Sequence, residues 1–288
     1  MTFCYILGNP RSGTSLFRLM LNAHPHMVAP PECGFIQWNH PTFAAANFSL
    51  KSTQQEFAQA VLRSKKMETW GLSAEALERA FEKVTQPNYQ RMCEAVLSAY
   101  FQARGQALGE VREAPKVAVD KNNYYLDFLP EIDAAMPHAL YLHVVRDVRD
   151  VAASYLEIER KGHDGKYAPK LATSAEDIAQ SWVENNERTA AFLADKKHLV
   201  VRYEDVLVRP EIELARVAMF LGVDYNERMS RYYEYNDEPQ ETLGWKQKTL
   251  QPVDPSRAGA FRKELAPEFG DQLWELAQET LEKFGYTY

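Results

Sequence analysis

The feature that most constrains this chain is a glycine-containing loop near its first residues. The loop has the sequence GNPRSGTS at residues 8–15 and follows the apolar run Phe3–Leu7, which we predict to be a buried strand. A helical pattern follows, with apolar residues at 16, 17, 19 and 20 and a stop at His24-Pro25. A strand, a glycine loop and a helix in this order place backbone N–H groups and a helix N-terminus around anionic oxygens. The sequence therefore predicts an α/β fold with an anion site after its first strand.

The loop differs from a nucleotide P-loop at one informative position. Gly8 and Gly13 have the spacing of GxxxxGK[ST], but Thr14 stands where that pattern has lysine. A nucleotide triphosphatase needs this lysine and a magnesium ion to neutralise a terminal phosphoryl group of about two negative charges. A terminal sulfonate carries one charge, for which Arg11 within the loop is a sufficient cation. The alternative is a structural strand-to-helix turn that happens to contain two glycines.

Three further apolar runs predict strands: Lys116–Val119, Ala139–Val145 and His198–Val201. Polar residues and then a helical pattern follow each run, as in a parallel sheet with crossover helices. We therefore predict a three-layer, P-loop-like α/β fold with a central parallel sheet of about four to five strands and a C-terminal helix.

The chain is predicted to be a single domain over residues 1–288, with a helical cap insertion at about residues 35–112 and a long loop at about 236–263. The predicted helices of the cap are Gln55–Ser64, Ser73–Val84 and Tyr89–Arg104. The remaining predicted helices are Asn123–Ala135, Val148–Arg160, Ala175–Ala194, Pro210–Leu221 and Pro267–Phe284.

Composition excludes several other classes of protein. The formal net charge of −7 argues against non-specific nucleic-acid binding. No apolar run approaches the ~20 residues of a membrane span, and core-like sequence begins at Phe3, so we expect no membrane anchor. Cys4, Cys33 and Cys93 lack the spacing of a zinc site or a disulfide framework. We therefore expect a cytoplasmic protein with reduced thiols.

Polar and cationic residues follow all four predicted strands. After the first strand comes the glycine loop, and after the others come residues 120–123 (DKNN), 146–147 (RD) and 202–205 (RYED). Ligands of open α/β sheets bind beyond these carboxyl ends. The pattern predicts a polyanion site, and the alternative is that loops are simply solvated.

These segments resemble the motifs of the sulfotransferases that use 3′-phosphoadenosine 5′-phosphosulfate (PAPS). Residues 10–15 (PRSGTS) resemble the 5′-phosphosulfate loop PxxGT[ST], and residues 146–154 resemble the 3′-phosphate motif RDPxDxxxS, with Val148 in place of proline. Residues 202–205 resemble the family's RYEDL segment, and residues 256–262 resemble its late glycine-containing loop. The resemblance runs from residue 3 to about 263, interrupted by the cap.

The resemblance implies transfer of the sulfuryl group of PAPS to a hydroxyl or amine of an acceptor, such as a carbohydrate or a small metabolite. The product would be 3′-phosphoadenosine 5′-phosphate (PAP), and no metal is required. The cofactor-binding residues that it implies are Arg11, Ser12, Gly13, Thr14, Ser15, Arg146, Ser154, Tyr203, Arg257 and Gly259. The loop at 236–263 would close over this cofactor.

Sulfuryl transfer needs a cation at the leaving oxygens and a base for the acceptor's proton. Arg11 and Lys121 are the candidate cations. Some relatives place a histidine base two residues after a lysine in this region, where this chain has Asn123. Glu32, in the loop after the first helix, resembles a glutamate of carbohydrate- and protein-modifying relatives and is the predicted base. The alternative is an exposed loop glutamate.

Two other functions stay open from the sequence. A divergent P-loop kinase would use ATP and magnesium, with Asp120 as the candidate metal ligand. A non-catalytic relative would bind a nucleotide without chemistry, although Arg11, Lys121 and Arg146 are all present.

Overall fold

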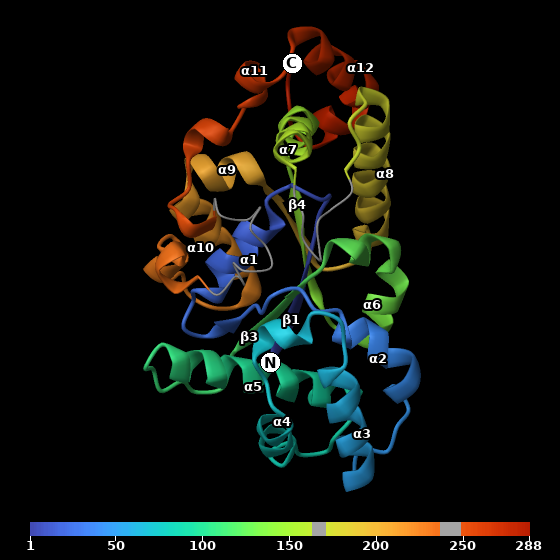
Figure 1. The fold of residues 1–288 in the computed structure, drawn as a ribbon, viewed down its shortest axis with the longest axis vertical. Helices are drawn as coiled ribbons and strands as arrows, with labels where there is room; N and C mark the ends of the chain where they lie inside the picture. The colour runs from blue at the N-terminus through green and yellow to red at the C-terminus, as the bar shows by residue number, and fades with distance from the viewer. Residues whose placement is uncertain (163–170, 237–248) are drawn as a thin grey trace.

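A computed structural model describes residues 1–162, 171–236 and 249–288 of the chain. Its centre is one parallel sheet of five strands in the order β2-β3-β1-β4-β5 (Figure 1). The strands are β1 (Thr2–Leu7), β2 (Met27–Val28), β3 (Val117–Lys121), β4 (Leu140–Val145) and β5 (His198–Arg202). The predicted parallel α/β sheet is confirmed. Strand β2 is new, because a strand of two residues leaves no periodic signal in a sequence.

Both faces of the sheet are buried, which explains why its strands are continuous apolar runs. Along β1, Phe3, Tyr5 and Leu7 pack on one face, and Cys4 and Ile6 pack on the other. This alternation is the two-residue period of a strand.

Helices cover the two faces in separate groups. Helices α1 (Thr14–Asn22) and α10 (Pro210–Leu221) pack with Cys4 and Ile6 on one face. Helices α7 (Val148–Lys161), α8 (Ala175–Leu193) and α12 (Pro267–Lys283) share a second cluster beyond β4, at the upper end of Figure 1.

The insertion between β2 and β3 covers the opposite face together with α6 (Leu129–Ala135). It consists of α2 (Phe35–Phe43), α3 (Lys51–Leu62), the short 3₁₀ helix η1 (Met67–Trp70), α4 (Ala74–Phe81) and α5 (Tyr89–Ala107). These elements gather at the lower end of Figure 1. The sequence did not predict α2, which contains Pro41, a residue that disfavours helix interiors.

Two other segments differ from the prediction. The helix predicted over Asn123–Ala135 is divided into η2 (Asn123–Asp127) and α6, because Phe128 between them leaves the helical region at φ −136°. Strand β5 runs directly into the unpredicted α9 (Tyr203–Val208). Of the predicted loop at 236–263, residues 237–248 lie outside the described part of the chain. The part from 249 on contains η6 (Pro255–Arg257) and α11 (Phe261–Glu264).

Candidate active site

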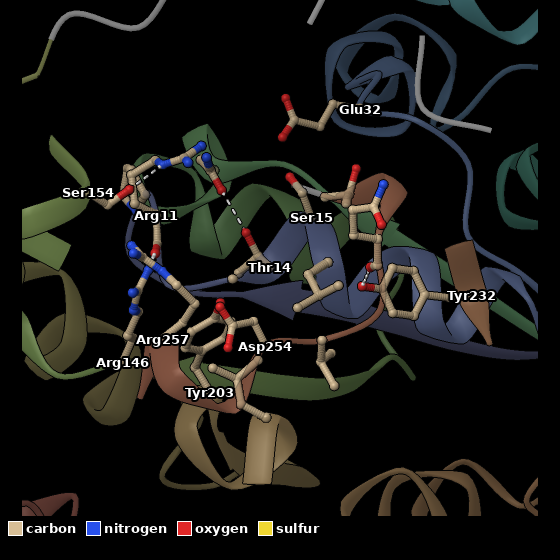
Figure 2. Close-up of a pocket in the computed structure, with 18 of the residues that line it drawn as sticks. Arg11, Thr14, Ser15, Glu32, Arg146, Ser154, Tyr203, Tyr232, Asp254 and Arg257 are labelled. Carbon is tan, nitrogen blue, oxygen red and sulfur yellow. Dashed lines mark hydrogen bonds between the residues drawn. The ribbon is translucent and has the colours of Figure 1, made fainter. Parts of the chain in front are cut away.

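A cavity of about 500 Å³ lies beyond the carboxyl ends of the strands. Among its lining residues are Arg11, Gly13, Thr14, Ser15, Glu32, Lys66, Asn123, Arg146, Ser154, Tyr203, Tyr232, Asp254 and Arg257. In Figure 2 the arginines and Ser154 gather at one end, Thr14 and Ser15 lie in the middle, and Glu32 stands apart from the arginines. The cavity therefore has a cationic end and a carboxylate end, with the glycine loop between them.

Two residues of the glycine loop that line the cavity have a left-handed backbone conformation. Arg11 has φ 67° and Gly13 has φ 86°, and Gly13 is the residue that precedes α1. A Cβ on Gly13 would lie 2.1 Å from the ring of Tyr203, so only glycine fits there. No side chain caps α1, and no acidic residue stands in its first turn. Because Gly13, Thr14 and Ser15 line the cavity, the N-terminal N–H groups and the positive dipole end of α1 lie at its wall, where an anion would be stabilised.

The cationic end is built from Arg11, Arg146 and Ser154. The Arg11 Nε donates to Ser154 Oγ at 3.1 Å, and Arg146 Nη1 donates to the Arg11 carbonyl at 3.1 Å. Burial, and then the charge of Arg146, lower the pKa of the Arg11 guanidinium. Within the described residues neither arginine makes an ion pair with an acidic side chain, although the charges of Asp150 and Glu204 act on Arg146 from a longer distance.

Arg146 carries the most informative detail of the site. Its side chain is 5% exposed and lies over the Tyr203 ring, 4.5 Å from the ring centroid. Its Nε and Nη2 are buried and have no hydrogen-bond partner within the described residues. Buried guanidinium N–H groups normally have acceptors, because leaving them unpaired costs free energy. Two adjacent N–H donors on a planar fork fit two oxygens of one phosphate group.

The late glycine-containing loop is held against this end by Asp150. One carboxylate oxygen of Asp150 accepts the N–H of Gly259 at 2.7 Å, and the other accepts that of Phe261 at 2.8 Å. This brings Arg257, which pairs with Glu264, to the wall of the cavity. The sequence interpretation gave Asp150 no role, although it is the second aspartate of the 146–150 segment.

The remaining predicted residues fall into two groups. Thr14 and Ser15 line the cavity, and Thr14 Oγ1 donates to Asn123 Oδ1 at 3.3 Å. Ser12 and Gly259 are not among the residues that line it, and the Ser12 hydroxyl is buried in the turn.

The carboxylate end centres on Glu32, which lies between two lysines. Lys121, the last residue of β3, is 1% exposed at its side chain and bonds to Oε1 of Glu32. Lys66, from the insertion, donates to Oε2 at 2.8 Å. Lys121 Nζ also lies 3.4 Å from the Ser15 hydroxyl, which links Glu32 to the glycine loop. The structure thus brings the predicted Glu32 and Lys121 together and adds Lys66, for which the sequence held no signal.

Asp120 does not serve as a ligand on the cavity wall. Its side chain turns into the core under the insertion, where the Tyr125 hydroxyl donates to Oδ2 at 2.6 Å. Burial raises the pKa of this carboxyl from 3.8 to about 7. The described residues contain no group of three metal-ligating side chains. The placement of Asp120 removes the magnesium ligand that the kinase alternative required.

The buried Asp120 predicts a specific pH dependence of stability. Between about pH 4 and pH 7 the folded protein binds a proton at Asp120 that the unfolded chain lacks, so this group's contribution to the free energy of unfolding is lost as the pH rises. Three pKa units correspond to about 4 kcal/mol. We therefore expect the free energy of unfolding of Asp120→Asn, measured by urea denaturation, to gain about 3 kcal/mol relative to that of the wild-type protein between pH 5 and pH 8.

The comparison of the two proteins isolates Asp120 from other titrating groups. His143, whose pKa burial lowers to about 4, titrates in both proteins and cancels from the difference. An equal stability difference at pH 5 and pH 8 would contradict the prediction.

Comparison with known proteins identifies one family. Residues 4–227 match the sulfotransferase family. A putative protein-tyrosine sulfotransferase of Caenorhabditis briggsae is 26% identical over 235 residues, which cover 80% of this chain and 69% of that protein. The nodulation protein NoeE of Sinorhizobium fredii is 24% identical, over 77% of this chain. Protein-tyrosine sulfotransferase 1 of Danio rerio is 25% identical, over 81% of this chain. The matches span 50% of NoeE and 57% of the Danio rerio protein.

Two solved structures share the fold. The sulfotransferase domain of the Synechococcus PCC 7002 olefin synthase superposes with a TM-score of 0.61 at 22% identity, covering 100% of this chain and 96% of that one. The sulfotransferase domain of the curacin biosynthetic pathway gives 0.64 at 19% identity, covering 99% and 98%. Among the helices that the structure describes, none has the length and apolar character needed to cross a bilayer.

Proposed function

The chain belongs to the sulfotransferase family, and from this premise we propose that its cavity binds PAPS and that its product is PAP. The observation that carries the proposal is Arg146, which is 5% exposed and presents two unpartnered N–H donors within the described residues. Ser154 and Arg11 lie beside it, joined at 3.1 Å. This end would take the 3′-phosphate, with Arg257 and the loop at Gly259 alongside it.

The glycine loop supports the second half of the cofactor site. Gly13 precedes α1, and Thr14 and Ser15 are its first residues. The N–H groups of these three residues would hold the 5′-phosphosulfate together with Arg11. Ser12 would shape the loop rather than contact the anion, because its N–H donates to the Asn9 carbonyl at 3.1 Å and its hydroxyl is buried. Tyr203, stacked under Arg146 and against Gly13, would lie near the adenosine. When bound, PAPS supplies the sulfuryl group and a stable leaving phosphate.

The protein's own residues then have separate tasks. Arg11 and Lys121 would stabilise the negative charge that develops on the bridging and leaving oxygens. Glu32 would accept the proton of the acceptor hydroxyl, which enters from the carboxylate end of the cavity. No step needs a metal ion, because the arginines and the N-terminus of α1 supply positive charge at the anion site.

The acceptor that we propose is a hydroxyl group of a small molecule, a carbohydrate or a tyrosyl side chain. The names of the relatives in Caenorhabditis briggsae and Danio rerio support the last of these. Three probes distinguish the classes: a tyrosine-containing peptide, 2-naphthol and chitotetraose, each incubated with ³⁵S-labelled PAPS. We further propose a cytoplasmic location, supported by Cys4, Cys33 and Cys93, which are buried thiols without disulfides.

Calorimetric titration with PAP in the presence of EDTA tests the cofactor site. We expect binding without metal and an affinity for ATP–Mg²⁺ that is about 10- to 100-fold weaker, because ATP lacks the 3′-phosphate that would engage Arg146. Equal or tighter binding of ATP–Mg²⁺ would overturn the cofactor assignment and favour a kinase.

A further inference from the structure

Lys66 combines an unfavourable backbone conformation with a position in the cavity wall. It lies between α3 and η1 with φ 71°, in the left-handed region that a side chain other than glycine rarely adopts. Thr69 fixes this conformation, because its N–H and its hydroxyl donate to the Lys66 carbonyl at 3.0 and 2.7 Å. Backbone strain that the surroundings hold in place is characteristic of functional sites.

The side chain of Lys66 points at the predicted base. Its Nζ is 2.8 Å from Oε2 of Glu32, while Lys121 contacts Oε1. Lys66 and Glu32 both line the cavity, and their side chains are 21% and 16% exposed. Figure 2 shows the Glu32 carboxylate standing beyond Ser15, at the opposite side of the cavity from Arg146.

The insertion also makes a hydrogen bond to the loop that carries Glu32. The indole N–H of Trp70, at the end of η1, donates to the carbonyl of Pro31 at 2.9 Å. Trp70 packs against Phe35 and Tyr100, with ring centroids 5.6 and 5.2 Å apart. One short, packed element, η1, thus has Lys66 directly before its first residue, and its last residue, Trp70, bonds to the residue that precedes Glu32.

The ion pair between Lys66 and Glu32 lies in the wall of the cavity, where its geometry bears on a bound acceptor as well as on folding. We propose that Lys66 is a positioning residue for sulfuryl transfer. Its ammonium group holds Oε2 of Glu32 while Lys121 holds Oε1, and the carboxylate lone pairs that remain are directed at the acceptor hydroxyl. This inference rests on the proposed function, and it makes the insertion part of the catalytic apparatus.

Three substitutions separate positioning from folding. Lys66→Met removes the ammonium group at similar length, and Lys66→Arg keeps the charge. Lys66→Gly removes the side chain and also relaxes the backbone, because glycine adopts φ 71° without strain. Lys65→Met is the matched control, because Lys65 is the preceding lysine in the chain, is exposed and does not line the cavity. The assay follows ³⁵S transfer from PAPS to whichever of the three acceptor probes the wild-type protein sulfates fastest.

We expect Lys66→Met and Lys66→Gly to lower kcat at least about tenfold, while the KM for acceptor and the affinity for PAP change less than about threefold. Lys66→Gly should unfold at the same temperature as wild type or higher, which excludes misfolding. Lys66→Arg should retain most of the wild-type kcat. In a Glu32→Gln background, Lys66→Met should have almost no further effect, because both substitutions act on one group.

Wild-type kcat in Lys66→Met and Lys66→Gly would overturn the inference, as would a change confined to the KM for acceptor, which would make Lys66 an acceptor-binding residue. Additive losses in the double variant would do the same. Failure of the proposed function is distinguishable, because the wild-type protein would then neither bind PAP nor transfer label to any of the probes.

Discussion

Arg146→Met is expected to weaken PAP binding by at least about 100-fold without lowering the stability of the ligand-free protein. Hydrogen bonds from a guanidinium to a phosphate contribute about 1.5–3 kcal/mol each, and Arg146 has two donors, Nε and Nη2, to offer. In the ligand-free protein the charge of Arg146 lowers the stability of the fold, because a buried and incompletely paired cation costs free energy. Methionine fills a similar volume and needs no partner. Calorimetry with PAP and thermal unfolding measure the two effects.

Two further variants sharpen this test. Arg146→Lys keeps the charge and loses the fork, so its affinity for PAP should lie between wild type and Arg146→Met. Arg188→Met is the control, since Arg188 is an exposed arginine paired with Asp127 at 3.1 Å outside the cavity, and it should bind PAP as wild type does. Unchanged affinity in Arg146→Met would place the 3′-phosphate elsewhere.

Glu32→Gln is expected to lower kcat by about 10²- to 10⁴-fold, the usual contribution of a general base, while PAP affinity stays within about twofold of wild type. The amide still accepts a hydrogen bond from a lysine through its oxygen, but it cannot take the acceptor's proton. Single-turnover transfer of ³⁵S to the preferred acceptor probe measures the chemical step, and calorimetry measures the binding of PAP.

The control for this variant is Glu113→Gln, at an exposed glutamate outside the cavity, for which we expect wild-type kcat. Retained turnover in Glu32→Gln would remove the base assignment. A parallel loss of PAP affinity would instead show that Glu32 organises the cofactor site, for example through Lys121.

Most of the sheet could be predicted from the sequence because its signals are local. Consecutive apolar residues indicate a strand such as Phe3–Leu7. The predicted helix Pro210–Leu221 is found in the structure with the same bounds. Among the elements that were missed, β2 and α9 are too short for a period to be visible, and α2 contains Pro41, which argues against a helix. Phe128 divides a predicted helix whose apolar pattern continues across the break.

The cationic end of the site was also within reach of the sequence. The glycine loop, Arg146 and Tyr203 follow parallel strands directly, and the carboxyl ends of parallel strands meet at one edge of the sheet. The chain's local order thus determines that these residues converge. Their distances, and the two unpartnered donors of Arg146, are visible only in three dimensions.

Tertiary structure alone decided the surroundings of the proposed base and the closure of the site. Lys66 contacts Glu32 from an insertion whose apolar residues pack against the sheet. Asp150 accepts a hydrogen bond from the backbone N–H of Gly259, which lies in a distant part of the chain. Neither contact has a sequence spacing that a strand or helix period can encode. Sequence determines what is repeated along one element, whereas contacts between elements depend on how buried surfaces pack, and packing is a property of the whole fold.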